Sequence, residues 1–201
     1  MIFHTSAWFA LGAAALASIG CDSGAATQGA MGSVDVPAAV GRAMELYDSD
    51  SDGVLSAAEL EKAPSLNYVA SAGSGSLTRD QLTETLAALF GATSTGPEGY
   101  SCVIVSRGRP LSSAQVTFKP AEFLAGSLPE AKGTTDASGR ADMSVASEQL
   151  PEASRGYPVV YPGLYQIVVE HSSLKKAHKP MGCQVGGFIR AAAVPTFDVG
   201  R

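Results

Sequence analysis

The stretch Asp48-Ser-Asp-Ser-Asp-Gly-Val-Leu-Ser-Ala-Ala-Glu59 decides how the first half of the chain folds. It carries carboxylates at positions 1, 3, 5 and 12 and a glycine at position 6. Calcium takes roughly 6–8 oxygen ligands at about 2.3–2.6 Å, and this spacing supplies them from one short loop. Gly53 can adopt the positive φ that the sharp turn needs. The predicted ligands are Asp48, Asp50, Asp52, the backbone carbonyl of Val54, Ser56 directly or through water, and both carboxylate oxygens of Glu59.

The residues on both sides of this loop favour helices. Apolar side chains recur at helical spacing from Val36 to Tyr47, and Pro37 suits a first helical turn. The run Ser56-Ala-Ala-Glu59 has the form of a capping box, so a second helix begins there. Every key position of the pattern D-x-[DN]-x-[DN]-G-x₅-E is filled, and the stretch therefore resembles an EF-hand. The alternative is a solvated acidic turn that binds no ion.

A weaker copy of the pattern follows. The sequence Gly53–Leu60 is repeated in outline by Gly75–Leu82, which places a second loop at Ala70–Gln81. This loop has no carboxylate at positions 1, 3 or 5, so we expect it to fold without binding calcium. EF-hands usually pair through a short two-stranded contact, expected here between Leu55 and Leu77. The alternative for this second stretch is a plain helical hairpin that resembles an EF-hand by chance.

The chain begins with an apolar segment without charged side chains, residues 1–20, followed by Cys21. The segment resembles a bacterial lipoprotein signal, in which the cysteine after a small residue becomes lipidated. It departs from the usual pattern, because Ser18 stands where leucine is expected and no Lys or Arg precedes the apolar run. The resemblance implies an exported protein, periplasmic or at the cell surface, held by acyl chains on Cys21. Export without lipidation and a retained membrane anchor are the alternatives. Residues 21–34 are typical of a flexible tether.

The second half of the chain predicts short strands. Residues 92–99 are rich in turn formers, and from residue 100 onward the pattern changes to apolar alternation. About seven short strands within residues 100–201 predict a β-sandwich. The fold class expected for the whole chain is therefore α+β in two domains, a small all-α EF-hand pair followed by a seven-stranded antiparallel β-sandwich. The clearest predicted strands are 102–105, 114–119, 141–145, 162–170, 182–185 and 196–199.

Three motifs in this half resemble carboxypeptidase-regulatory-like domains. They are Gly108–Phe118, Gly133–Ala141 and Pro162–Ile167, similar to the G-x-P-L-x-x-A-x-V-x-F, G-x-T-D-x-x-G-x-[AF] and P-G-x-Y-x-[IV] segments of that family. The resemblance implies a transthyretin-like sandwich that acts as a non-catalytic accessory module on exported bacterial proteins. The insertion Pro120–Lys132 departs from the shortest versions, and a short helix or a lid is expected there.

Composition excludes some classes of function. With 14 basic and 19 acidic residues the net charge is −5, which gives no electrostatic footprint for nucleic acid. His171 and His178 lack the spacing of a zinc site, and no general base is evident for a nucleophile, so we expect no enzyme activity. In an exported protein Cys102 and Cys183 could form a disulfide; two buried free thiols are the alternative.

These features together predict an exported calcium-binding protein with a non-catalytic interaction domain, in contact with the membrane only through a lipid anchor. Its other partner would be an unidentified envelope protein or glycan. The alternative function is a carbohydrate-binding or adhesion module in which calcium is only structural. A flat exposed patch formed by Tyr157, Tyr161 and Tyr165 would favour that alternative.

Overall fold

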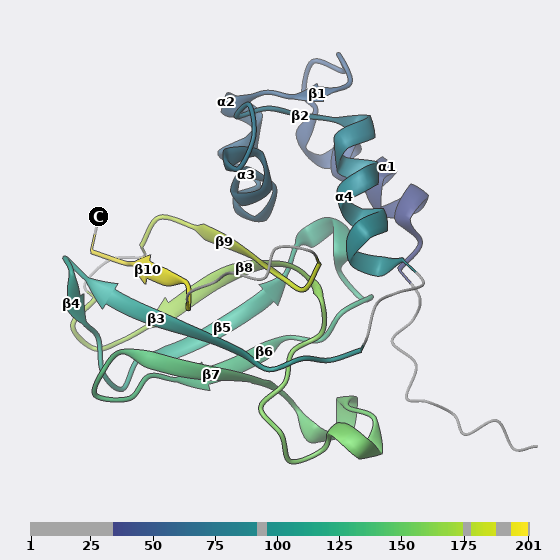
Figure 1. Cartoon of the computed structure of the whole chain (residues 1–201). Coiled ribbons are helices and arrows are strands. Elements are labelled where there is room, and N and C mark those ends of the chain that lie inside the picture. The colour runs from purple at the N-terminus through teal and green to yellow at the C-terminus, as the bar shows by residue number, and fades with distance from the viewer. Residues whose placement is uncertain (1–33, 92–95, 175–177, 188–193, 201) are drawn as a thin grey trace, which may run out of the picture.

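The computed structural model describes residues 34–91, 96–174, 178–187 and 194–200, and it has an α+β fold (Figure 1). The predicted signal peptide, Cys21 and nearly all of the predicted tether lie outside the described residues. Within the described residues, no helix has both the length and the apolar character needed to cross a bilayer.

Four helices form the first half, and local sequence explains where they begin. Asp35 caps α1 (Val36–Tyr47) by accepting a hydrogen bond from the Ala38 amide at 3.0 Å. After the short α2 (Ala57–Leu60), α3 (Pro64–Ser71) begins at a proline, which has no amide hydrogen to leave unpaired. The fourth helix, α4 (Arg79–Phe90), begins at a capping box formed by Thr78 and Gln81. The apolar faces of α1 and α4 are buried.

Two very short strands join the two loops of this half. Strand β1 (Val54–Leu55) pairs antiparallel with β2 (Leu77–Thr78), and Leu55 lies opposite Leu77. Both leucines are buried, with exposed fractions of 0% and 4%. The predicted contact between the two loops is therefore formed at the expected residues.

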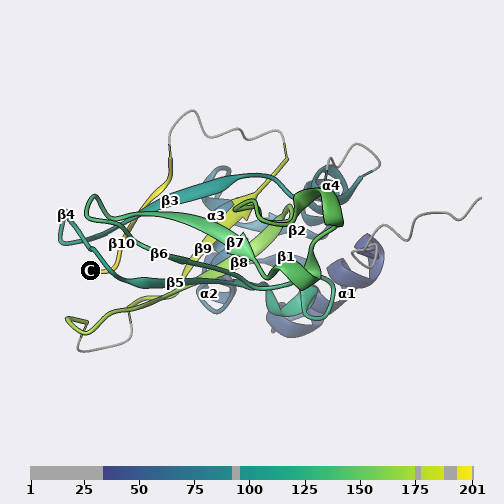
Figure 2. The same ribbon diagram turned by 90° about the horizontal axis from the view of Figure 1, so that it is seen from below.

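The second half is one continuous sheet of eight strands that curls around its apolar face, in the order β10-β3-β7-β6-β5-β8-β9, with β4 paired to β3. The sheet is continuous because β7 pairs with β3 along its first part and with β6 at its end. Seen from below, β3 and β5 run on opposite sides of the curl with β7 and β6 between them (Figure 2). The strands are β3 (Tyr100–Ser106), β4 (Arg109–Pro110), β5 (Gln115–Pro120), β6 (Ala131–Thr134), β7 (Arg140–Val145), β8 (Gly163–Glu170), β9 (Met181–Val185) and β10 (Thr196–Asp198).

Three details differ from the sequence-based expectation. Strand β10 pairs parallel with β3, so the sheet is not entirely antiparallel. Arg109 and Pro110, which lie outside the strands predicted from the sequence, form the two-residue strand β4. Strand β6 was not expected, because Ala131, Lys132 and Gly133 have poor strand propensity and their pairing with β5 and β7 decides their conformation.

The helices pack directly against the sheet rather than standing apart from it (Figure 1). Helix α3 lies on β9, where Gly182 allows the approach, because a Cβ at this position would overlap the Pro64 carbonyl. A second contact joins α1 to the 3₁₀-helix η1 (Glu122–Leu124), where Arg42 Nε donates to the Phe123 carbonyl at 3.0 Å. The buried apolar residues of both halves form one cluster. The predicted short helix in the insertion is thus a 3₁₀-helix that packs against α1.

Candidate metal site

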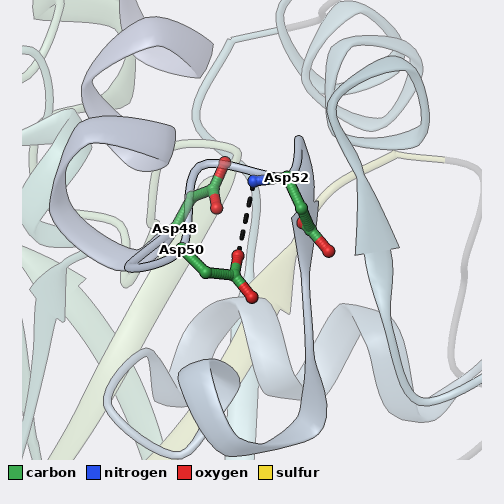
Figure 3. Close-up of side chains that lie close together, drawn as sticks. All are labelled: Asp48, Asp50 and Asp52. Carbon is green, nitrogen blue, oxygen red and sulfur yellow. Dashed lines mark hydrogen bonds between the residues drawn. The ribbon is translucent and has the colours of Figure 1, made fainter.

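Three carboxylates converge in the loop after α1. Asp48, Asp50 and Asp52 each place one carboxylate oxygen so that the three atoms all lie within 4.8 Å of one another (Figure 3). They are the only group of three or more His, Cys, Asp or Glu residues with such spacing in the described part of the chain. Oxygen atoms gathered in this way are the ligands that hard divalent cations prefer.

The backbone of the loop holds each carboxylate in place. The Gly53 amide donates to Asp48 Oδ2 at 3.1 Å, the Asp52 amide to Asp50 Oδ1 at 3.3 Å, and the Val54 amide to Asp52 Oδ1 at 2.8 Å. The turn that allows this places Gly53 at φ 82°, where a side chain would be strained. One carboxylate oxygen of each aspartate therefore accepts a backbone hydrogen bond that orients the side chain, and the other oxygen remains available to bind a cation.

Asp48 Oδ1 is the most informative atom of the site. It is buried and has no hydrogen-bond partner, the only such side-chain oxygen or nitrogen among the described residues. Leaving a buried carboxylate oxygen unpaired costs free energy, and the neighbouring aspartates add repulsion between like charges. A cation bound between the three side chains would remove both penalties.

Glu59 lies outside the group of three aspartates. Its Oε1 accepts from the Ser49 amide at 2.6 Å, and its Oε2 accepts from the Ser56 amide and hydroxyl, both at 2.9 Å. Hydrogen bonds from Ser56 and then Ser49 lower the pKa of Glu59 from 4.5 to about 2, so the side chain is ionised at neutral pH. Its carboxylate thus ties the beginning of the loop to its end. The proposed roles of Val54, Ser56 and Glu59 as ligands stay predictions.

The second loop has the same turn but a different chemistry. Gly75 has φ 78°, and the Gln81 side chain accepts from the Thr78 amide at 2.9 Å, as Glu59 does from Ser56. The Ser74 hydroxyl is 3.3 Å from that of Ser76, and no carboxylate stands at the corresponding positions. The second loop therefore repeats the turn of the first loop but lacks its three aspartate carboxylates.

The remaining residues singled out from the sequence lie in the sheet half. Cys102 and Cys183 are both buried, with exposed fractions of 0%, and the structure has them as free thiols, which was the alternative to the possible disulfide. Burial raises the pKa of Cys102 to about 12, which keeps it protonated and unreactive at neutral pH.

The three tyrosines do not form the exposed patch that would favour carbohydrate binding. Tyr157 is 65% exposed, but Tyr161 and Tyr165 are buried, with exposed fractions of 3% and 0%. The Tyr161 hydroxyl donates to the Gln149 carbonyl and the Tyr165 hydroxyl to the Tyr161 carbonyl, both at 2.9 Å. Alternation along the β8 strand could have indicated the burial of Tyr165 in advance.

Sequence reasoning did not find the hollow between α3, α4 and the end of β9. It has a volume of about 590 Å³, and its lining includes Tyr68, Leu77, Leu89 and Glu84. These residues come from separate elements, and no local pattern links them. The contact of η1 with α1 was missed for the same reason.

Comparison of the chain with protein-family models, with curated proteins and with solved structures found no match to it.

Proposed function

We propose that this protein binds calcium through the loop Asp48–Glu59 of an EF-hand-like helical pair. The observation that carries the proposal is the convergence of three aspartates around a buried Asp48 oxygen that has no partner. The pairing of Leu55 with Leu77 adds support, because it is the contact expected between two EF-hand loops.

The chemistry of the donors favours calcium over other divalent ions. The candidate ligands are all oxygen atoms, whereas zinc and copper sites use His or Cys. Magnesium requires near-octahedral geometry at about 2.0–2.1 Å, while calcium accepts more ligands in a flexible arrangement such as a loop provides. For a single site in an exported protein we expect a dissociation constant on the order of 10⁻⁴–10⁻³ M.

Titration calorimetry with calcium and, separately, with magnesium tests this proposal. The parent chain should release or take up heat with calcium, and Asp48→Ala should abolish the signal. Asp80→Ala makes the same chemical change in the loop without carboxylate ligands and should leave binding intact. A parent chain that shows no calcium-dependent heat at millimolar calcium would end the proposal.

We further propose that the sheet half is a non-catalytic β-sandwich of the transthyretin-like kind and that it contacts an envelope protein or glycan. The positions of the motifs support this, since Gly133–Ala141 runs from the end of β6 into β7 and Pro162–Ile167 begins β8. In such a sandwich β7 would link the two sides of the curled sheet, because it pairs with both β3 and β6. The chain would be exported and anchored by lipid at Cys21. Mass spectrometry of the N-terminal peptide from envelope fractions tests the anchor. A pull-down with and without chelator tests whether the partner depends on calcium.

A further inference from the structure

The insertion between β5 and β6 reaches from the sheet to the helix that leads into the metal loop. Its 3₁₀-helix η1 is fixed to the sheet, because the Ala121 amide donates to the Leu164 carbonyl of β8 at 2.9 Å. Phe123 and Leu124 are buried, with exposed fractions of 1% and 0%. The first part of the insertion is therefore anchored to the sheet and extends from it.

Two contacts join this extension to α1. Arg42 Nε donates to the Phe123 carbonyl at 3.0 Å. One and a half turns further along α1, in the same packing of α1 on η1, burial and then the nearby Glu122 carboxylate, as a charge and as a hydrogen-bond partner, raise the pKa of the partly buried Tyr47. Both contacts are made by residues adjacent in η1, so they hold the C-terminal half of α1 against a single short segment.

This half of α1 ends at the first predicted metal ligand. Tyr47 is the last residue of the helix, and Asp48 caps it through its amide, which donates to the Met44 carbonyl at 2.9 Å. Helix ends fray, and the last turn of α1 has no basic side chain to offset the helix dipole. Outside contacts that hold this turn therefore also fix where the Asp48 carboxylate lies.

We propose that Glu122 and Phe123, which bind no metal themselves, are positioning residues for the calcium site and act through Tyr47 and Arg42 on Asp48. The inference rests on the proposed calcium function and adds that affinity depends on the sheet half. A docked α1 presents Asp48 already in place, so less ordering is required when the ion binds. Because coupling free energy is reciprocal, calcium should in turn tighten the contact between α1 and η1.

The test compares calcium affinities of the full chain by titration calorimetry. Tyr47→Phe removes the hydroxyl and keeps the ring, and Glu122→Ala removes its acceptor. Each should weaken calcium binding about fivefold, the lower end of typical coupling between sites. The double variant should be no weaker than the single ones, because both changes remove the same contact.

Two matched controls separate this contact from general effects. Glu152→Ala removes an exposed carboxylate at the same position of another 3₁₀-helix, η3 (Glu152–Ser154), and Tyr157→Phe removes an exposed hydroxyl. Neither should change the affinity beyond twofold. In the parent chain, calcium should also shift the backbone amide NMR signals of residues 122–124, and this shift should shrink in Tyr47→Phe. A merely structural role of Tyr47 would not produce that signature.

The outcomes are distinguishable. If the parent binds calcium and both variants bind it within twofold as well, the positioning role is wrong and the proposed function stands. If Glu152→Ala weakens binding as much as Glu122→Ala, the effect is one of net charge and the inference also fails. If the parent does not bind calcium, the proposed function fails, and the positioning role fails with it.

Discussion

At the scale of single residues, the proposed calcium site predicts that Asp48 stabilises the protein with the ion bound and destabilises it without the ion. Its Oδ2 accepts from Gly53, while its buried Oδ1 has no partner and lies near two other carboxylates. Asp48→Asn keeps an acceptor for the Gly53 amide and replaces the unpaired, repelled oxygen by an NH2 group, for which the nearby Asp50 and Asp52 carboxylates are acceptors. Without calcium we expect the free energy of unfolding of the variant to exceed that of the parent by about 1 kcal/mol. This is the order of the free energy that an unpaired buried polar group costs. Calcium should reverse the order of stability, since the parent binds the ion more tightly.

Chemical denaturation of parent and Asp48→Asn, with chelator and with saturating calcium, measures both effects. Asp80→Asn is the control. The difference in unfolding free energy between this variant and the parent should be the same with chelator as with calcium. A variant less stable than the parent even in chelator would show that the unpaired oxygen carries no penalty.

The lowered pKa of Glu59 should make the free energy of unfolding depend on pH. Because its pKa is lowered to about 2 from 4.5, the folded chain prefers the ionised form more strongly than the unfolded chain does. This stabilisation is complete above about pH 4.5 and is lost as the pH falls toward 2. Glu59→Gln should therefore be less stable than the parent at pH 6 without calcium, and the difference should shrink at pH 3. Unfolding free energies at the two pH values measure it, with the exposed Glu61→Gln as control; a difference independent of pH would contradict the assigned cause.

At the scale of elements, the contact between α3 and β9 depends on the missing side chain of Gly182. A Cβ there would overlap the backbone of Pro64 and Ser65, and backbone cannot move as easily as a side chain. Gly182→Ala should therefore destabilise the fold by about 1–3 kcal/mol, as overpacking generally does. Gly41→Ala is the matched comparison, because a Cβ in this position of α1 meets nothing within 4 Å. It should stabilise the protein by about 0.5–1 kcal/mol. Thermal unfolding of both variants measures the two changes in stability. Equal changes in melting temperature for Gly182→Ala and Gly41→Ala would refute the role of Gly182.

The elements also show what the sequence could predict. The starts of α1 and α2 followed from local signals, since Pro37 and the capping box of Ser56 and Glu59 favour a helix start whatever packs around them. The three aspartates followed from spacing alone, because a tight loop leaves few conformations for alternating carboxylates. The parallel pairing of β10 depends on β3, which lies far away along the chain, and no local pattern encodes such a partner. Strand β6 has low strand propensity, so its pairing with the neighbouring β5 and β7 decides its conformation. The separate position of Glu59 was not predictable for a related reason, because serine donors compete for its oxygens.

At the scale of the whole molecule, the two halves share one buried apolar cluster. Helix α3 is held on β9 and α1 on η1, so neither half can unfold without exposing apolar surface of the other. We therefore expect a single cooperative transition in which circular dichroism of the helices and fluorescence of the sheet tyrosines change together. Calcium at 100 times its dissociation constant should stabilise the entire chain by about 2.7 kcal/mol. For a chain of this size that corresponds to a rise in melting temperature of roughly 5–10 °C.

The same shift should appear in both signals if, as proposed, calcium binds the folded chain, because the two halves of the folded chain share one buried apolar cluster. Asp48→Ala should lose the shift and keep the single transition. Two transitions, of which calcium moves only the helical one, would mean that the packing between α3 and β9 is too weak to couple the halves. In that case the sheet could not influence the metal loop through the insertion either, so this measurement also bears on the role of Glu122.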